Sequence, residues 1–174
     1  DHDRIDGALK IARETDFLII PGIEVSSLDG HVLGLNVQEA IPQRLSVHET
    51  VDRIHEAGGV AIACHPLAFL KVSLGKHTNS KFDAVEVINS SAFPFNYSVR
   101  RSREIASRLR IAQVAGSDAH YGPEIGCAYT VVNGESTVEE VMKAVKRGFC
   151  RPFGRAIPIT TRLKRELLVL KRKF

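Results

Sequence analysis

Short apolar runs that alternate with amphipathic stretches indicate an α/β fold for this chain. Residues 60–64 (VAIAC) are apolar at every position, which is typical of a strand that is buried on both faces. Residues 17–27 (FLIIPGIEVSS) also favour a strand, although Pro21 and Gly22 interrupt the pattern. Further strands are predicted at residues 31–37, 83–89, 111–115 and 128–132.

Helices are predicted between the strands by apolar spacing and by capping signals. A Ser-x-x-Glu pattern, whose two side chains satisfy backbone N–H groups at the start of a helix, occurs at Ser46–Glu49 and at Ser136–Glu139. Helices are predicted at residues 3–15, 46–57, 94–110, 136–147 and from 161 onward. Because strands alternate with helices, we expect a parallel sheet.

The composition is that of a globular protein with one domain. The chain has 174 residues, of which 44% are hydrophobic and 25% are charged, and this excludes a disordered or collagen-like chain. No apolar run approaches the roughly 18 residues that a membrane span needs, so we expect no membrane partner. The three cysteines have no CxxC spacing, which argues against a disulfide framework and favours a reducing, cytoplasmic location.

The net charge of +4 is concentrated near the C-terminus. Residues 162–174 hold six basic residues and one glutamate, whereas the rest of the chain is close to neutral. We therefore divide the chain into a body at residues 1–155 and a basic, helical tail at residues 156–174. The leucines of the tail need burial, so we expect it to pack on the outside of the body or on a partner subunit, away from any catalytic pocket.

Histidine and acidic residues fall at the ends of the predicted strands or in the turns beside them. In a parallel α/β protein the active site lies at the carboxyl ends of the strands, where His65, Asp118 and His120 fall directly. Glu24 and His31 lie at other strand ends. Each residue alone could be a turn former or an ion-pair partner, but burying several such groups together is costly without a cation. Imidazoles with carboxylates suit Zn²⁺, Mn²⁺ or Fe²⁺, so a divalent metal site is predicted.

The same residues carry a resemblance to the PHP family, the polymerase and histidinol phosphatase domain. The matching stretches come in the family's order: DHDRIDG at 1–7, GIEVSSLDGHVLGL at 22–35, CHP at 64–66, EVIN at 86–89 and GSDAH at 116–120. They cover the chain to about residue 155. The resemblance implies a distorted (β/α)₇ TIM-like barrel, two to three divalent cations (Mn²⁺, Zn²⁺ or Fe²⁺) and hydrolysis of a phosphoester.

The resemblance also implies a ligand set with roles in it. The implied metal ligands are His2, Glu24, His31, His65, Asp118 and His120. Glu24 matches a carboxylate that bridges two metals. His2, Asp118 and His120 are the candidate catalytic residues, since either histidine could protonate a leaving group. Family members begin with a strand that carries a His-x-His motif, so we expect such a segment, with further ligands, to precede Asp1 in the intact protein.

The function implied by the resemblance is attack on phosphorus by a metal-activated water. The matching stretches look closest to small stand-alone members that act on nucleotides or short oligonucleotide ends. The expected partner is therefore a small phosphorylated substrate or a nucleotide, with nucleic acid as a further partner. Candidate substrate-binding residues at a strand end, in a loop and on a basic helix are Asn89, Lys76 and Arg101.

An alternative function is a non-catalytic RNA-binding barrel that resembles the protein component of ribonuclease P. The basic tail would suit RNA. The ligand set distinguishes the two hypotheses, because a binding subunit has no need to keep all of these metal-ligating residue types together.

Overall fold

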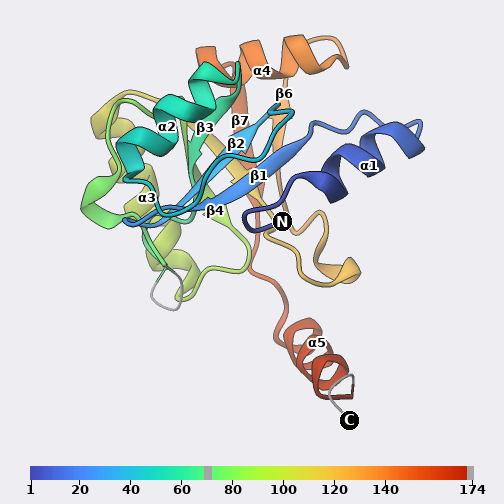
Figure 1. Ribbon diagram of the computed structural model, residues 1–174. Coiled ribbons are helices and arrows are strands. Elements are labelled where there is room, and N and C mark those ends of the chain that lie inside the picture. The colour runs from blue at the N-terminus through green and yellow to red at the C-terminus, as the bar shows by residue number, and fades with distance from the viewer. Residues whose placement is uncertain (69–71, 172–174) are drawn as a thin grey trace.

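The computed structural model of the protein describes residues 1–68 and 72–171 (Figure 1). Its main sheet has five strands in the order β1-β2-β3-β4-β5. Their bounds are Gly22–Ser26 (β1), His31–Leu35 (β2), Val60–Ala63 (β3), Ala84–Asn89 (β4) and Ala112–Gly116 (β5). A separate ribbon pairs β6 with β7, at Ala128–Val132 and Cys150–Gly154. The apolar runs therefore predict the strands well, except that residues 17–20 lie outside any strand and that β7 is not predicted.

The helices confirm those predicted from the sequence. They are α1 (Asp6–Glu14), α2 (Val47–Glu56), α3 (Phe95–Leu109), α4 (Val138–Arg147) and α5 (Ile159–Lys171), with short 3₁₀ turns at Gly75–His77 and Gly122–Glu124. The capping box of α2 is present, since Ser46 accepts from the Glu49 N–H and the Glu49 carboxylate accepts from the Ser46 N–H. Within the two described ranges, every helix falls short of the length and apolar character that crossing a bilayer demands.

The main sheet is mixed, so the prediction of a parallel sheet is wrong for its first half. β1–β2 and β2–β3 pair antiparallel, whereas β3–β4 and β4–β5 pair parallel. The loop 27–30 between β1 and β2 is too short for the crossover that a parallel pair requires. Gly30 permits this tight loop, because its φ is 144° and an added Cβ would lie 2.8 Å from the Leu74 nitrogen.

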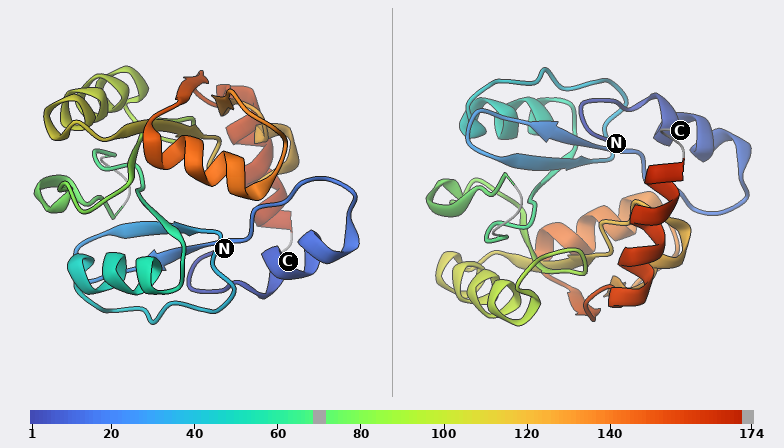
Figure 2. Two further views of the ribbon diagram at one scale, coloured as in Figure 1. Left: turned by 90° about the horizontal axis from the view of Figure 1, so that it is seen from above. Right: turned by 90° about the horizontal axis from the view of Figure 1, so that it is seen from below.

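Helices cover both faces of the main sheet, so the protein has three layers (Figure 2). On one face, Ile54 of α2 and Ala106 of α3 share a core with Ile23 of β1. On the other face, Met142 of α4 packs in a second core with Val60 of β3. Within the described residues the strands form this open sheet and the β6–β7 ribbon, and no closed barrel is found.

The C-terminal helix α5 extends away from the body of the protein (Figure 1). Its leucines do not pack on the body as expected from the sequence, because Leu163, Leu167 and Leu170 are 59%, 58% and 54% exposed. The helix is attached through arginines instead. Arg162 donates to the Ser90 carbonyl at 3.0 Å, and Arg165 forms an ion pair with the buried side chain of Glu124. Residues 172–174 of the expected tail lie outside the described residues.

The start of α4 gives a first test of the fold. The sequence pattern assigns the N-cap to Ser136, whereas in the structure the Thr137 hydroxyl accepts from the Glu140 N–H at 3.2 Å. We expect Thr137→Ala to lower the free energy of unfolding by about 1 kcal/mol, and Ser136→Ala to change it little. Urea denaturation of both variants measures the difference. Equal destabilisation by the two substitutions would contradict the assignment of the cap to Thr137.

Candidate metal centre

Glu24 and His31 lie on the same face of the β1–β2 hairpin. Burial alternates along both strands, so Ile23 and Val32 point into the core while Glu24 and His31 point to the opposite face. In the pairing register Glu24 faces Leu33, which makes His31 its diagonal neighbour. The Glu24 Oε1 atom is 2.9 Å from His31 Nδ1.

The antiparallel pairing explains why a residue at the start of a strand joins the site. His31 begins β2, which runs opposite to β1 and β3. The amino end of β2 therefore lies at the same edge as the carboxyl ends of its neighbours. His65, two positions beyond the end of β3, reaches Glu24 Oε1 with its Nε2 atom at 3.2 Å.

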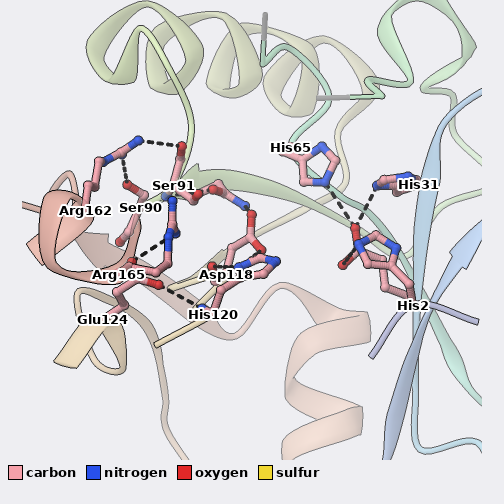
Figure 3. Close-up of polar contacts among 12 residues, drawn as sticks. His2, His31, His65, Ser90, Ser91, Asp118, His120, Glu124, Arg162 and Arg165 are labelled. Atoms are coloured by element: carbon pink, nitrogen blue, oxygen red, sulfur yellow. Dashed lines mark hydrogen bonds and ion pairs between the residues drawn. The ribbon is translucent and has the colours of Figure 1, made fainter. Parts of the chain in front are cut away.

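His2 reaches the same carboxylate from the N-terminal segment. The Asp3 N–H donates to the Glu24 carbonyl at 2.9 Å, and the Glu24 N–H donates to the Asp1 carbonyl at 3.1 Å. These bonds form a parallel bridge beside β1, which brings His2 Nε2 to 3.8 Å from Glu24 Oε2. We call His2, Glu24, His31 and His65 the imidazole cluster (Figure 3).

The charges of the imidazole cluster suit a cation. Burial opposes ionisation of Glu24, but its contacts with His31, His65 and His2 outweigh burial and hold the pKa of this carboxyl well below its usual range. Burial lowers the pKa of His2, although the neighbouring Glu24 opposes this. At neutral pH the cluster therefore presents a carboxylate beside a His2 imidazole that favours its neutral, metal-binding form.

The donor atoms of the cluster fit a divalent metal. His2, Glu24 and His31 each offer a ligand atom, and these atoms lie within 4.8 Å of one another. The buried Nδ1 atoms of His31 and His65 have no aligned hydrogen-bond partner among the described residues, even though His31 Nδ1 is close to Glu24. A carboxylate beside a buried imidazole nitrogen that lacks an aligned partner, as at Glu24 and His31 Nδ1, is an arrangement that Zn²⁺, Mn²⁺ or Fe²⁺ would complete.

Asp118 and His120 form a second group, the aspartate cluster, which lies apart from the imidazole cluster (Figure 3). Asp118 follows β5 with a φ of 51°, and its Oδ1 is 3.6 Å from His120 Nδ1. Asn89, at the end of the adjacent β4, donates its Nδ2 to Asp118 Oδ2 at 3.0 Å. The His120 side chain is 55% exposed and open to solvent. Four of the six predicted ligands, Glu24 included, therefore lie in the imidazole cluster. The other two lie in the neighbouring aspartate cluster.

Glu86 joins the two clusters, and the sequence analysis did not select it. Its Oε2 atom accepts from the His65 N–H at 2.8 Å and from Asn89 Nδ2 at 3.0 Å. Burial raises the pKa of Glu86, although its contacts with His65 and Asn89 oppose the rise. A signal for this residue was available, because Glu86 is the only charged residue in the strand sequence AVEVIN.

The predicted substrate-binding residues have different surroundings. Asn89 lies inside the site, but its amide is used within the protein, since it also accepts from the Ser91 N–H at 2.9 Å. Lys76 and Arg101 line a separate pocket between the 3₁₀ turn and α3, together with Arg108, and none of the predicted ligands lines it. Their contact with substrate stays a prediction.

The tail is linked to the aspartate cluster through one buried residue, Glu124. The His120 N–H donates to Glu124 Oε2 at 2.8 Å, and Glu124 Oε1 accepts from Arg165 Nη1 at 3.0 Å. Glu124 is fully buried, and Arg165 belongs to α5. The tail therefore lies closer to the predicted catalytic residues than the sequence analysis expected, although Arg165 contacts neither of their side chains in these bonds.

Sequence comparisons identify relatives of this chain. A family model described as PHP-associated matches residues 96–150. The uncharacterized protein MJ1587 of Methanocaldococcus jannaschii is 36% identical over 94 residues, which are 52% of this chain and 55% of that protein. The uncharacterized protein MJ0417 of the same organism is 32% identical over 118 residues, which are 63% and 49% of the two chains. This chain spans about half the length of these curated relatives.

Two solved structures are similar in fold. One is a two-domain protein from Bacteroides vulgatus that contains a predicted PHP-like metal-dependent phosphoesterase, with a TM-score of 0.62, 13% identity, and coverage of 89% of this chain and 50% of that chain. The other is PsfC from Pseudomonas syringae, with a TM-score of 0.62, 16% identity, and coverage of 79% and 60%. At these identities the likeness concerns the fold alone.

Proposed function

We propose that this chain takes part in metal-dependent hydrolysis of a phosphoester, which its resemblance to the PHP family and the PHP-associated match at residues 96–150 support. The observation that carries the proposal is the imidazole cluster, in which His2, His31 and His65 surround the Glu24 carboxylate. A purely structural role at the edge of a sheet would not require three imidazoles around one carboxylate.

The residues of the site would have different roles in the hydrolysis. His2, Glu24 and His31 would hold a divalent cation, with His65 beside the same carboxylate, and the cation would act as a Lewis acid that lowers the pKa of water and offsets phosphoryl charge. Asp118 keeps its carboxylate oriented through the Asn89 hydrogen bond. The exposed His120 imidazole would donate a proton to the departing alkoxide.

The finer parts of the proposal concern substrate, metals and fold. We propose nucleotides or short oligonucleotide ends as substrates, because Lys76 and Arg108 offer cationic groups to additional phosphates in one pocket, where Arg101 pairs with Glu104. For the intact protein, two to three cations (Mn²⁺, Zn²⁺ or Fe²⁺), a distorted (β/α)₇ barrel and a cytoplasmic location are proposed from the family resemblance alone.

Metal titration of the intact protein tests the proposal. Mn²⁺ or Zn²⁺ at about 100 times its dissociation constant should stabilise the fold by about 2.7 kcal/mol, which calorimetry detects as a raised melting temperature. The metal-loaded protein should release phosphate or nucleotides from phosphorylated nucleosides or oligonucleotides, and EDTA should stop the release. Metal-independent RNA binding without any hydrolysis would favour the alternative binding function.

A further inference from the structure

Glu86 is a half-buried acidic residue, and its hydrogen bonds with the described residues go to His65 of the imidazole cluster and to Asn89, which links the two clusters. Its Oε2 atom accepts from the His65 N–H at 2.8 Å, directly beside the imidazole cluster. The same atom accepts from Asn89 Nδ2 at 3.0 Å, and this nitrogen also donates to Asp118 Oδ2 at 3.0 Å. A continuous chain of hydrogen bonds therefore runs from His65 through Glu86 and Asn89 to Asp118.

The backbone of β4 is shaped around this side chain. The pairing of β4 with β5 shifts by one residue between Glu86 and Ile88, which is the signature of a β-bulge. A bulge changes the direction in which a side chain leaves the strand, and it is a common feature beside active sites. Val87 and Ile88 both lie in the same core, so the bulge places Asn89 on the face of Glu86, where its amide can donate to the carboxylate.

The neighbouring strand leaves space for the carboxylate. A Cβ atom added at Gly116 would lie only 2.7 Å from Glu86 Oε1. Gly116 ends β5, two residues before Asp118, and its φ is not in the left-handed region. Conformational freedom therefore does not require glycine at this position, whereas the approach of the Glu86 carboxylate does.

An acidic side chain in this position costs desolvation free energy, which an apolar residue with a purely structural role would avoid. Burial opposes the ionised form of Glu86, and the described residues place no lysine or arginine in hydrogen-bonding contact with it. An apolar residue would fill the strand interior without that cost. The contacts of Glu86 instead hold His65 directly and Asp118 through Asn89.

We propose that Glu86 is a positioning residue that sets the separation between His65 and Asp118, so that the two clusters can act on one phosphoester. This inference rests on the proposed function. Asn89 connects Glu86 to Asp118, because its side-chain amide donates a hydrogen bond to each carboxylate. Glu86 acts through other residues and needs no contact with substrate.

Three variants of the intact protein test the role of Glu86. Glu86→Gln keeps the shape but removes the charge, and Gly116→Ala displaces the carboxylate while leaving Glu86 in the sequence. Glu139→Gln, at an exposed glutamate of α4, is the matched control. We expect the first two variants to weaken Mn²⁺ binding about 10- to 100-fold in calorimetric titrations, as loss of an outer support of a metal ligand does elsewhere, and the control to match wild type.

Further readouts separate this proposal from the proposed function. In the protein without metal, hydrogen exchange at the His65 amide should become faster in Glu86→Gln, because a neutral amide oxygen is a weaker acceptor than a carboxylate. With metal, kcat should fall more than KM changes. Wild type that binds Mn²⁺ but hydrolyses no phosphoester would overturn the proposed function only. Folded variants with unchanged His65 exchange and Mn²⁺ affinity within twofold of wild type would overturn the role of Glu86.

Discussion

Replacing Glu24 by glutamine is expected to abolish metal binding at the imidazole cluster, and with it any hydrolysis. The carboxylate is the group that His2, His31 and His65 share, at 3.8, 2.9 and 3.2 Å respectively. A neutral amide has nearly the same shape but removes the negative charge and offers a single weaker acceptor. Since loss of a mere supporting contact costs about 10- to 100-fold in affinity, loss of this ligand should exceed about 100-fold.

Equilibrium dialysis with Mn²⁺ or Zn²⁺ measures the effect of Glu24→Gln, and circular dichroism shows whether the fold is kept. Glu39→Gln, at an exposed position before α2, is a control with the same change of charge. The cluster would lose its assigned role if Glu24→Gln bound the cation as tightly as this control.

The second large effect is expected at Arg165, which is 20% exposed and pairs with the fully buried Glu124. Arg165→Met leaves the Glu124 carboxylate buried with its cation removed, and breaking a buried pair in this way typically costs 3–5 kcal/mol. We expect a loss of about 3 kcal/mol in the free energy of unfolding. Denaturation in urea measures it.

Two further variants show whether the loss at Arg165 has the stated cause. Lys164→Met changes an exposed neighbour on α5 and should alter stability little. The double variant Glu124→Met with Arg165→Met should recover most of the stability, because two apolar groups of similar size can replace a buried ion pair. If the double variant were as unstable as Arg165→Met, an unpaired Glu124 charge would not be the reason for the loss.

The sequence predicts the imidazole cluster better than it predicts the sheet that holds it. Glu24, His31 and His65 are polar residues at the ends of apolar runs, so their placement is visible without a structure. The direction of each strand is not visible in an apolar run, because parallel and antiparallel pairs bury the same side chains. The length of the loop 27–30 was the available signal, and it requires the antiparallel hairpin that brings His31 to the correct edge.

Acidic residues that act through other residues are harder to find in the sequence than the candidate ligands. Glu86 precedes a bulge in β4, and Glu124 lies in a 3₁₀ turn and is completely buried. Neither position follows from hydrophobic periodicity, which assigns charged residues to the surface. The tail shows the converse: its helix was predicted, but its arginines rather than its leucines make the contacts with the body.

The mixed sheet has a consequence for the order in which the site assembles during folding. Glu24 and His31 come from the β1–β2 hairpin, whose loop is only residues 27–30, so their contact closes a short loop and forms early. His65 and Asp118 reach their places only after longer connections have closed, over residues 36–59 before β3 and over residues 90–111 before β5, and each closure has a greater entropic cost. The chain would therefore offer a cation two candidate ligands while the rest of the sheet is still forming, and a metal bound at that stage would favour the native register of the hairpin before His65 and Asp118 arrive.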